Sequence, residues 1–222
     1  MLKKPLFRLS LAILAVCGLT AATATAQQTP DVVTVGTVAA NGPVINVPVY
    51  VRDVAGTPLG IDQPFGSRIQ AFSIKVDYPV SPYITGVTFT RAGITAGLTP
   101  TFETSPSAAG TISLLMSFDE TTNLVPFVSN APAPGNPVGQ LTFTFAPSTP
   151  PGTNIPLTLD ATLTQLDNDG GTTTETTING ALALVNGAVT VLAVPAADTP
   201  TLGTWALLVL AAALTLLALR KL

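Results

Sequence analysis

The chain has 222 residues, with nine basic and 12 acidic side chains, one cysteine and no histidine. The absence of histidine excludes Ser-His-Asp and Cys-His catalysis and the usual zinc and copper ligand sets. Between Gln27 and Asp198, four basic side chains stand against all 12 carboxylates, which gives this segment a net charge of −8. We therefore expect neither nucleic acid nor an anionic membrane surface to be a partner.

The first 26 residues have the three parts of a secretory signal peptide: a basic start, an apolar run at 9–19 and a small-residue cleavage motif. The basic residues are Lys3, Lys4 and Arg8, and the cleavage motif consists of Ala24, Thr25 and Ala26 before Gln27. A lipoprotein site at Cys17 is the alternative, disfavoured because Val16 stands where a small residue is required. Cleavage after Ala26 would remove the only cysteine, so core packing has to stabilise the exported domain.

Nine short segments between residues 27 and 194 read as strands, and several of them place apolar side chains at every second position, as strands with one buried face do. The segments are 32–38, 44–54, 69–78, 84–92, 111–118, 138–146, 155–166, 174–184 and 188–194. Glycine and proline cluster between them, as at 131–137 and 148–152. This pattern predicts an all-β domain over 27–194, folded as an antiparallel two-sheet sandwich of about nine strands. Pro48, inside an otherwise regular strand, indicates an edge or a bulge.

The order of these segments resembles a cohesin domain. The opening stretch 32–51 is similar to the first two strands of that family, 71–79 and 84–93 to the next two, and 185–191 to the last. The resemblance covers about 31–192 and implies a jelly-roll sandwich in which the first and last strands are neighbours. It also implies a non-catalytic domain whose partner is a dockerin, a small calcium-loaded helical protein. Two departures are Asp77 before Tyr78, where the family more often has the reverse order, and an insert at 56–67.

Carboxylates are the acid–base groups that remain in the chain. Asp119 and Glu120 are adjacent, so on a strand their side chains would point to opposite faces and would not work as a pair. We interpret them as a solvated strand end. The sequence presents no other paired acid and base, and we predict that the protein is not an enzyme.

The sequence D-N-D-G-G at 167–171 has some features of a calcium loop. When Gly170 is placed at loop position 6, Asp167 and Asp169 fall correctly at positions 3 and 5. Positions 1 and 12 are then Gln165 and Thr176, where Asp and Glu are needed, so the match to an EF-hand or dockerin repeat fails. We interpret the segment as a turn between strands. A weak calcium site made by Asp167, Asp169 and backbone carbonyls is the alternative, and no other cofactor is expected.

Carbohydrate-binding surfaces favour exposed aromatic side chains. The only tryptophan is in the tail, and the tyrosines Tyr50, Tyr78 and Tyr83 are scattered along the chain. We interpret the tyrosines as sheet margins and most phenylalanines as core. Polysaccharide binding or a passive matrix role is therefore an alternative to protein binding, not the first hypothesis.

The C-terminal segment 200–222 is an apolar run that ends in basic residues. From Trp205 to Leu219 only Thr215 interrupts the apolar side chains, and 15 to 18 helical residues extend roughly 22–27 Å, slightly less than a ~30 Å hydrocarbon core. The segment, preceded by a linker at 195–199, resembles the IPTL-CTERM and PEP-CTERM sorting signals of Gram-negative bacteria. The matching residues are Pro200, Thr201, Leu202, Trp205, Arg220 and Lys221.

This second resemblance implies a membrane helix in the precursor, recognition and cleavage by an exosortase-type enzyme, and delivery to the cell surface or the extracellular space. The leading hypothesis is an exported, non-catalytic, cohesin-like module that binds a protein through one face of the sandwich. It predicts an exposed apolar patch rimmed by Thr and Ser on one sheet.

Overall fold

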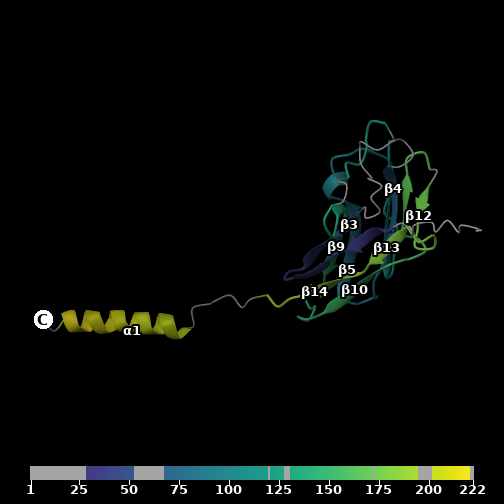
Figure 1. Ribbon diagram of the computed structural model, residues 1–222. Coiled ribbons are helices and arrows are strands. Elements are labelled where there is room, and N and C mark those ends of the chain that lie inside the picture. The colour runs from purple at the N-terminus through teal and green to yellow at the C-terminus, as the bar shows by residue number, and fades with distance from the viewer. Residues whose placement is uncertain are drawn as a thin grey trace, which may run out of the picture.

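The computed structural model of the chain describes residues 29–52, 68–119, 121–127, 131–171, 173–194 and 202–220. Figure 1 shows the strands packed against one another and the long helix α1 (Leu202–Leu219) at the C-terminal end. The strands are β1 (Asp31–Val35), β2 (Thr37–Ala40), β3 (Val44–Arg52), β4 (Ile69–Asp77), β5 (Ile84–Arg91), β6 (Pro100–Thr104), β7 (Ser107–Ala108), β8 (Thr111–Phe118), β9 (Asn136–Phe145), β10 (Asn154–Leu159), β11 (Gln165–Asn168), β12 (Thr174–Glu175), β13 (Leu182–Val185) and β14 (Gly187–Val191). The helices are the 3-10 turn η1 (Gly93–Thr95) and α1 (Leu202–Leu219).

The strands form two sheets. The first has five strands in the order β13-β1-β3-β9-β5. The second has nine strands, with the path β12-β11-β4-β10-β14-β2, and β8 pairs with β4 and carries β6 and β7 on its other side. The all-β two-sheet sandwich predicted from the sequence is therefore confirmed.

The core follows from the alternation seen in the sequence. On β3, Val47, Val49 and Val51 are fully buried, and the residues between them face outward. Aromatic rings fill the centre: Phe72 meets Phe118 edge-on with ring centroids 6.4 Å apart. All described core residues lie between Val33 and Val191. Because this stretch contains a complete core, we expect the chain from 27 to 198 to fold by itself.

Two segments that are far apart in the sequence but adjacent in space pass from one sheet to the other at the same place. The predicted strand 32–38 breaks at Gly36 into β1 of the first sheet and β2 of the second, and the chain makes the same change between β13 and β14. The two crossings touch, because a Cβ built on Gly187 would lie 2.2 Å from the carbonyl oxygen of Gly36. Glycine is needed at position 187 for this close approach.

The parallel pairing at this crossing corrects the all-antiparallel prediction. β1 pairs in parallel with β13, and β2 in parallel with β14. The first and last parts of the sandwich are thus neighbours, as the cohesin resemblance implied. The first and last segments of the sandwich cross together, so each contributes one strand to each sheet.

Pro48 does not mark an edge, because β3 lies between β1 and β9. It is tolerated there because β1 ends at Val35, and the carbonyl of Pro48 accepts a hydrogen bond from the N–H of Gly36 at 2.9 Å. The bulge reading is nearly right, since the β3–β9 register shifts between Val49 and Tyr50.

The strand count is also corrected, from about nine to 14 among the residues that the structure describes. The predicted strand 155–166 is two strands, β10 and β11, and 174–184 is likewise β12 and β13. β6 and β7 were not predicted. The reason is visible in β6, where four of five residues are exposed and no apolar alternation exists.

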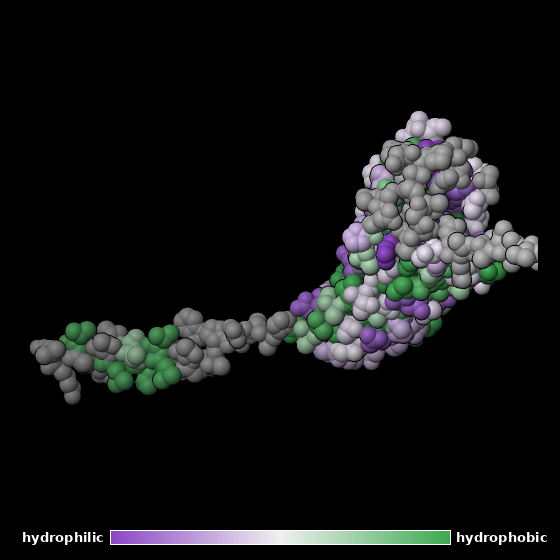
Figure 2. Space-filling model, in the orientation of Figure 1, coloured by the Kyte–Doolittle hydropathy of each residue, from purple (hydrophilic) through white to green (hydrophobic). Residues whose placement is uncertain are grey.

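Several predictions at the chain ends lie outside the described residues: the signal peptide with Ala24, Ala26 and Gln27, the linker 195–199, and Pro200, Thr201 and Lys221 of the sorting motif. Leu202 and Trp205 lie in α1, and Arg220 follows it. In the described part of the chain, no helix is long and apolar enough to cross a membrane. The predicted transmembrane helix is therefore not supported. Figure 2 shows hydrophobic surface on α1 and a mixed surface on the sandwich.

Candidate binding face

One outer sheet surface combines apolar and charged side chains, and we call it the β4–β8 face. Strands β4 and β8 lie side by side, and both bury every second residue. The residues between the buried ones point outward. They are Ala71, Ser73, Lys75 and Asp77 on β4 and Thr111, Ser113, Leu115 and Ser117 on β8.

The apolar centre of this face comes from β6 and β8. Phe102 of β6 stands opposite Ser117, and its side chain is 54% exposed. Leu115 is half-buried between Thr104 on one side and Ser73 on the other. Serine and threonine hydroxyls thus surround two apolar side chains. The sandwich carries the apolar patch rimmed by Ser and Thr that the sequence predicts.

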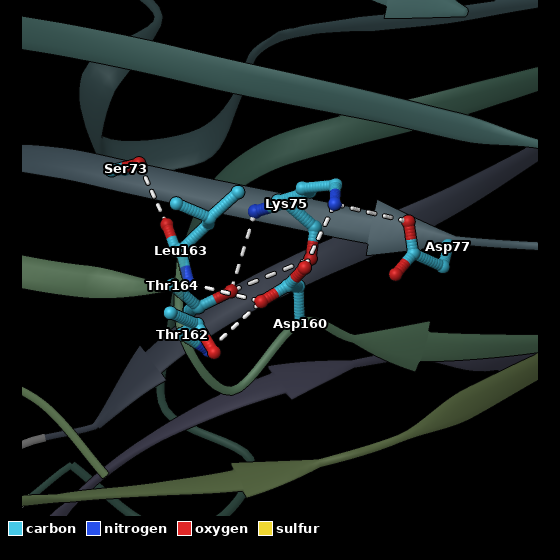
Figure 3. Close-up of polar contacts among 7 residues, drawn as sticks. All are labelled: Ser73, Lys75, Asp77, Asp160, Thr162, Leu163 and Thr164. Carbon is cyan, nitrogen blue, oxygen red and sulfur yellow. Dashed lines mark hydrogen bonds and ion pairs between the residues drawn. The ribbon is translucent and has the colours of Figure 1, made fainter. Parts of the chain in front are cut away.

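A short loop adds a third apolar side chain beside Lys75. β10 and β11 both pair with β4, and residues 160–164 between them bulge away opposite Lys75. Asp160 holds this loop, because its Oδ1 accepts hydrogen bonds from the backbone N–H groups of Thr162 (2.8 Å) and Leu163 (3.0 Å). The Ser73 hydroxyl donates to the Leu163 carbonyl at 2.8 Å (Figure 3). Leu163 is therefore fixed on the face with its side chain 51% exposed.

Lys75 ties the loop to β4 through charge. Its Nζ lies 2.7 Å from Oδ2 of Asp160 and 3.6 Å from Oδ1 of Asp77. Figure 3 shows the ammonium between the two carboxylates. The Lys75 backbone N–H also donates to the hydroxyl of Thr164 at 3.3 Å, so the loop is held from both sides.

The pKa shifts of this cluster favour a permanent ion pair. The hydrogen bond from Lys75 is the largest cause lowering the pKa of the Asp160 carboxyl, and the same bond raises the pKa of the Lys75 ammonium. Both groups stay charged at neutral pH. The Lys75–Asp160 pair can therefore orient a partner's polar groups, and neither member of the pair is poised to exchange a proton near neutral pH.

The outer surface of the five-stranded sheet has a different character. Its central row is Asn46, Thr142 and Thr88 on three adjacent strands, and the Thr142 hydroxyl donates to Asn46 Oδ1 at 2.9 Å. Tyr50 points outward on β3, which lies between β1 and β9, so it is not at the margin of the sheet as interpreted. This row has hydroxyl and amide groups but no ion pair.

The structure places the predicted carboxylates apart from the β4–β8 face centre. Asp119 follows β8 and caps a turn, where hydrogen bonds led by that of the Thr121 hydroxyl lower its pKa to about 2. Such an acid is ionised at neutral pH and is no general acid. Glu120 lies outside the described residues.

The D-N-D-G-G segment is a turn between β11 and β12, as interpreted from the sequence. Gly170 and Gly171 have φ values of 82° and 59°, which a glycine adopts without strain. Asp169 is buried and ion-paired with Arg68, whose Nε lies 2.5 Å from Oδ2, and Asp167 accepts a hydrogen bond from the Thr174 hydroxyl. A guanidinium beside the carboxylate disfavours a calcium ion, and no three His, Cys, Asp or Glu side chains of the described chain come together.

The tyrosines do not form a strip. Tyr78 packs edge-on against Phe143 with ring centroids 5.5 Å apart, and burial raises the pKa of its hydroxyl. Tyr50 lies on the other sheet. The residues that the sequence reasoning missed are Phe102, Leu115 and Leu163. Phe102 lies on the unpredicted β6, and Leu163 interrupts a predicted strand, so neither had a period-2 signal.

No protein-family model and no curated protein sequence matches the chain. Similar folds are found among solved structures. The sixth cohesin of scaffoldin B from Acetivibrio cellulolyticus, solved with a dockerin, is 15% identical with a TM-score of 0.51, and the match covers 73% of this chain and 99% of that chain. The third cohesin of ScaC from the same organism, also solved with a dockerin, is 14% identical with a TM-score of 0.52 and the same coverages. CaCohA2 from Clostridium acetobutylicum is 16% identical with a TM-score of 0.51, covering 74% of this chain and 92% of that chain. The domain therefore has a cohesin-like sandwich fold.

Proposed function

We propose that the domain is a non-catalytic binding module that holds a folded protein partner on the β4–β8 face. The observation that carries this proposal is the outward-facing apolar group of exposed Phe102 and Leu163 and half-buried Leu115, beside the Lys75–Asp160 ion pair. Apolar anchors within a hydroxyl rim are the arrangement that protein interfaces use, because the centre loses water on binding while the rim stays wet.

A dockerin-type partner is the form of this proposal that the fold supports. Two of the similar structures are cohesins in complex with dockerins. A dockerin is loaded with calcium and this domain has no carboxylate cluster in its described part, so any calcium dependence of binding would come from the partner.

Affinity capture from culture supernatant tests the proposal, with residues 27–198 as bait. We expect one or a few partners that the Phe102→Glu bait fails to retain and that EGTA releases. Val44→Glu is the matched control, because Val44 is 51% exposed on the other sheet. Partners retained equally by all three baits would contradict binding at the β4–β8 face, and retention in EGTA would contradict a dockerin.

Export and processing form a second part of the proposal. The basic and apolar start of the chain and the motif from Pro200 to Lys221 support secretion followed by removal of the tail by an exosortase-type enzyme. Mass spectrometry of the secreted protein should find Gln27 at the N-terminus and an end near Pro200. An intact tail in the extracellular protein would contradict the processing step.

A further inference from the structure

The edge of the five-stranded sheet is left open at β5. In the described chain β5 pairs only with β9, and at eight residues it is the longest strand that ends a sheet. Other terminal strands are short: β12 and β7 have two residues each, and β2 and β13 have four. Exposed edges usually carry prolines or charges that prevent pairing with another strand. From Ile84 to Thr90, β5 has neither, and its one irregularity is the register shift against β9 between Ile84 and Gly86.

The hydrogen-bond pattern shows which groups face the open side. The N–H of Ala92 donates to the Val138 carbonyl at 3.2 Å, so Ala92 points its backbone groups toward β9. In an antiparallel pair this direction alternates along the strand. Thr90 and Thr88 therefore also face β9, and the N–H and C=O groups of Phe89 and Val87 point away from it.

The space beside this edge is hollow. A depression of about 220 Å³ lies along the first half of β5, lined by Ile84, Gly86 and Val87 and, across the gap between the sheets, by Tyr78, Val80 and Gly110. Val80 is 75% exposed. An arriving strand would meet open backbone and apolar side chains there.

We propose that β5 pairs with β5 of a second copy of the same chain, in antiparallel orientation about a two-fold axis at Thr88. In this register Val87 of one copy stands opposite Phe89 of the other, and the two pairs exchange about four backbone hydrogen bonds. Thr88 meets Thr88 of the second copy as a non-hydrogen-bonded pair, with side chains close enough for a favourable Thr–Thr contact. Thr90 meets Gly86, which leaves room for its methyl group.

No local charge opposes a second copy in this register. Like charges directly opposite each other destabilise a strand pair, and the self-paired positions are uncharged. The nearest charged side chain, Arg91, is held by Glu103 at 2.8 Å. The remaining opposition is the long-range repulsion between two acidic domains, which salt screens over about 8 Å at 0.15 M. We expect salt to strengthen the dimer.

Sedimentation velocity on residues 27–198 tests this dimer. The protein concentration should run from about 10 µM to about 1 mM, the range in which an interface smaller than the standard size is expected to associate. Wild type is expected to shift to a dimer as concentration rises. Thr88→Glu and Thr88→Lys place like charges on the axis, so each alone should dimerise at least tenfold more weakly, and an equimolar mixture should recover association as a heterodimer. Thr34→Glu, on the same surface but on β1, is the matched control and should dimerise as wild type does.

The charge-swap recovery separates this interface from a folding defect, because a misfolded variant would not be recovered by its opposite. A wild type that stays monomeric over the whole range would overturn the proposal, as would a mixture that stays monomeric or a Thr88→Glu variant that still dimerises. The result is independent of the β4–β8 face: Phe102→Glu should dimerise normally, and Thr88→Glu should still bind the partner.

Discussion

The ion pair between Arg68 and Asp169 allows a direct test of what stabilises the D-N-D-G-G turn. The Asp169 side chain is fully buried and that of Arg68 is 11% exposed. Asp169 accepts hydrogen bonds from Nε of Arg68 at 2.5 Å and from its backbone N–H at 3.1 Å. Asp169→Ala removes these acceptors and leaves the guanidinium with little access to water. Breaking a buried pair in this way costs about 3–5 kcal/mol.

Urea unfolding followed by far-ultraviolet circular dichroism measures this cost. With a slope of about 2 kcal/mol/M, a loss of about 4 kcal/mol moves the midpoint down by about 2 M. Asp167→Ala is the matched control in the same turn: Asp167 is half-buried and bonds to the Thr174 hydroxyl, so we expect a loss of about 1 kcal/mol. Asp169→Asn keeps the shape of the side chain and serves if the alanine variant does not fold.

The same experiment decides between the ion pair and the calcium alternative. If the turn is held by Arg68, adding calcium or EGTA leaves the wild-type midpoint unchanged. A midpoint that rises with calcium would show that Asp167 and Asp169 ligate the ion, and a loss below about 1 kcal/mol in Asp169→Ala would refute the buried-pair reasoning.

Three further predictions follow from particular contacts. Gly187→Ala should destabilise the domain by about 3 kcal/mol or more in thermal unfolding, because its Cβ would lie 2.2 Å from the Gly36 carbonyl oxygen, whereas Gly97→Ala, with open space around it, should be nearly neutral. The lowered pKa of Asp160 means that its ion pair stabilises the fold above the ordinary carboxyl pKa of 3.8 and that this contribution is lost as pH falls through the lower folded pKa. In Asp160→Asn the free energy of unfolding should therefore fall less steeply than in wild type as pH drops below about 3.8. A variant with the same pH dependence of stability as wild type would contradict the role given to this ion pair. Phe102→Ala should weaken partner binding roughly 70-fold in a titration, because covering the 54% exposed ring removes about 100 Å² from water, worth about 2.5 kcal/mol. A change below threefold would contradict a central position for Phe102.

The sandwich could be predicted because its core residues alternate in sequence. Phe72, Ile74 and Val76 have the same spacing in the chain and in the buried layer, so the period alone identifies β4. The parallel pairs could not be foreseen, because the break of the first strand at Gly36 depends on a contact with Gly187 that is 151 positions away along the chain. Long-range contacts of this kind leave no local pattern.

The candidate site was foreseen only in kind. The sequence predicts an apolar patch with a Ser and Thr rim but not its residues, although the alternation on β8 shows in the structure that Leu115 points outward. Phe102 was not identified, because β6 has no apolar alternation and was not predicted. The loop that presents Leu163 is held by Asp160, which accepts hydrogen bonds from backbone N–H groups and pairs with Lys75 of β4. The contact with Lys75 is long-range, so the sequence of residues 155–166 does not indicate it.

The same alternation explains why this chain has the fold of cohesins that are only 14–16% identical to it, and why the shared fold does not identify its partner. Stability depends on the inward residues, and any apolar side chain of suitable size preserves them. Between each pair of inward residues lies an outward one that the core does not constrain, and on β4 and β8 these are Ser73, Lys75, Ser113 and Leu115. Binding specificity can therefore change completely without any change in the core. For this reason the variants that identify the partner are those at Phe102, Leu115 and Leu163, and a substitution in the core would report only on folding.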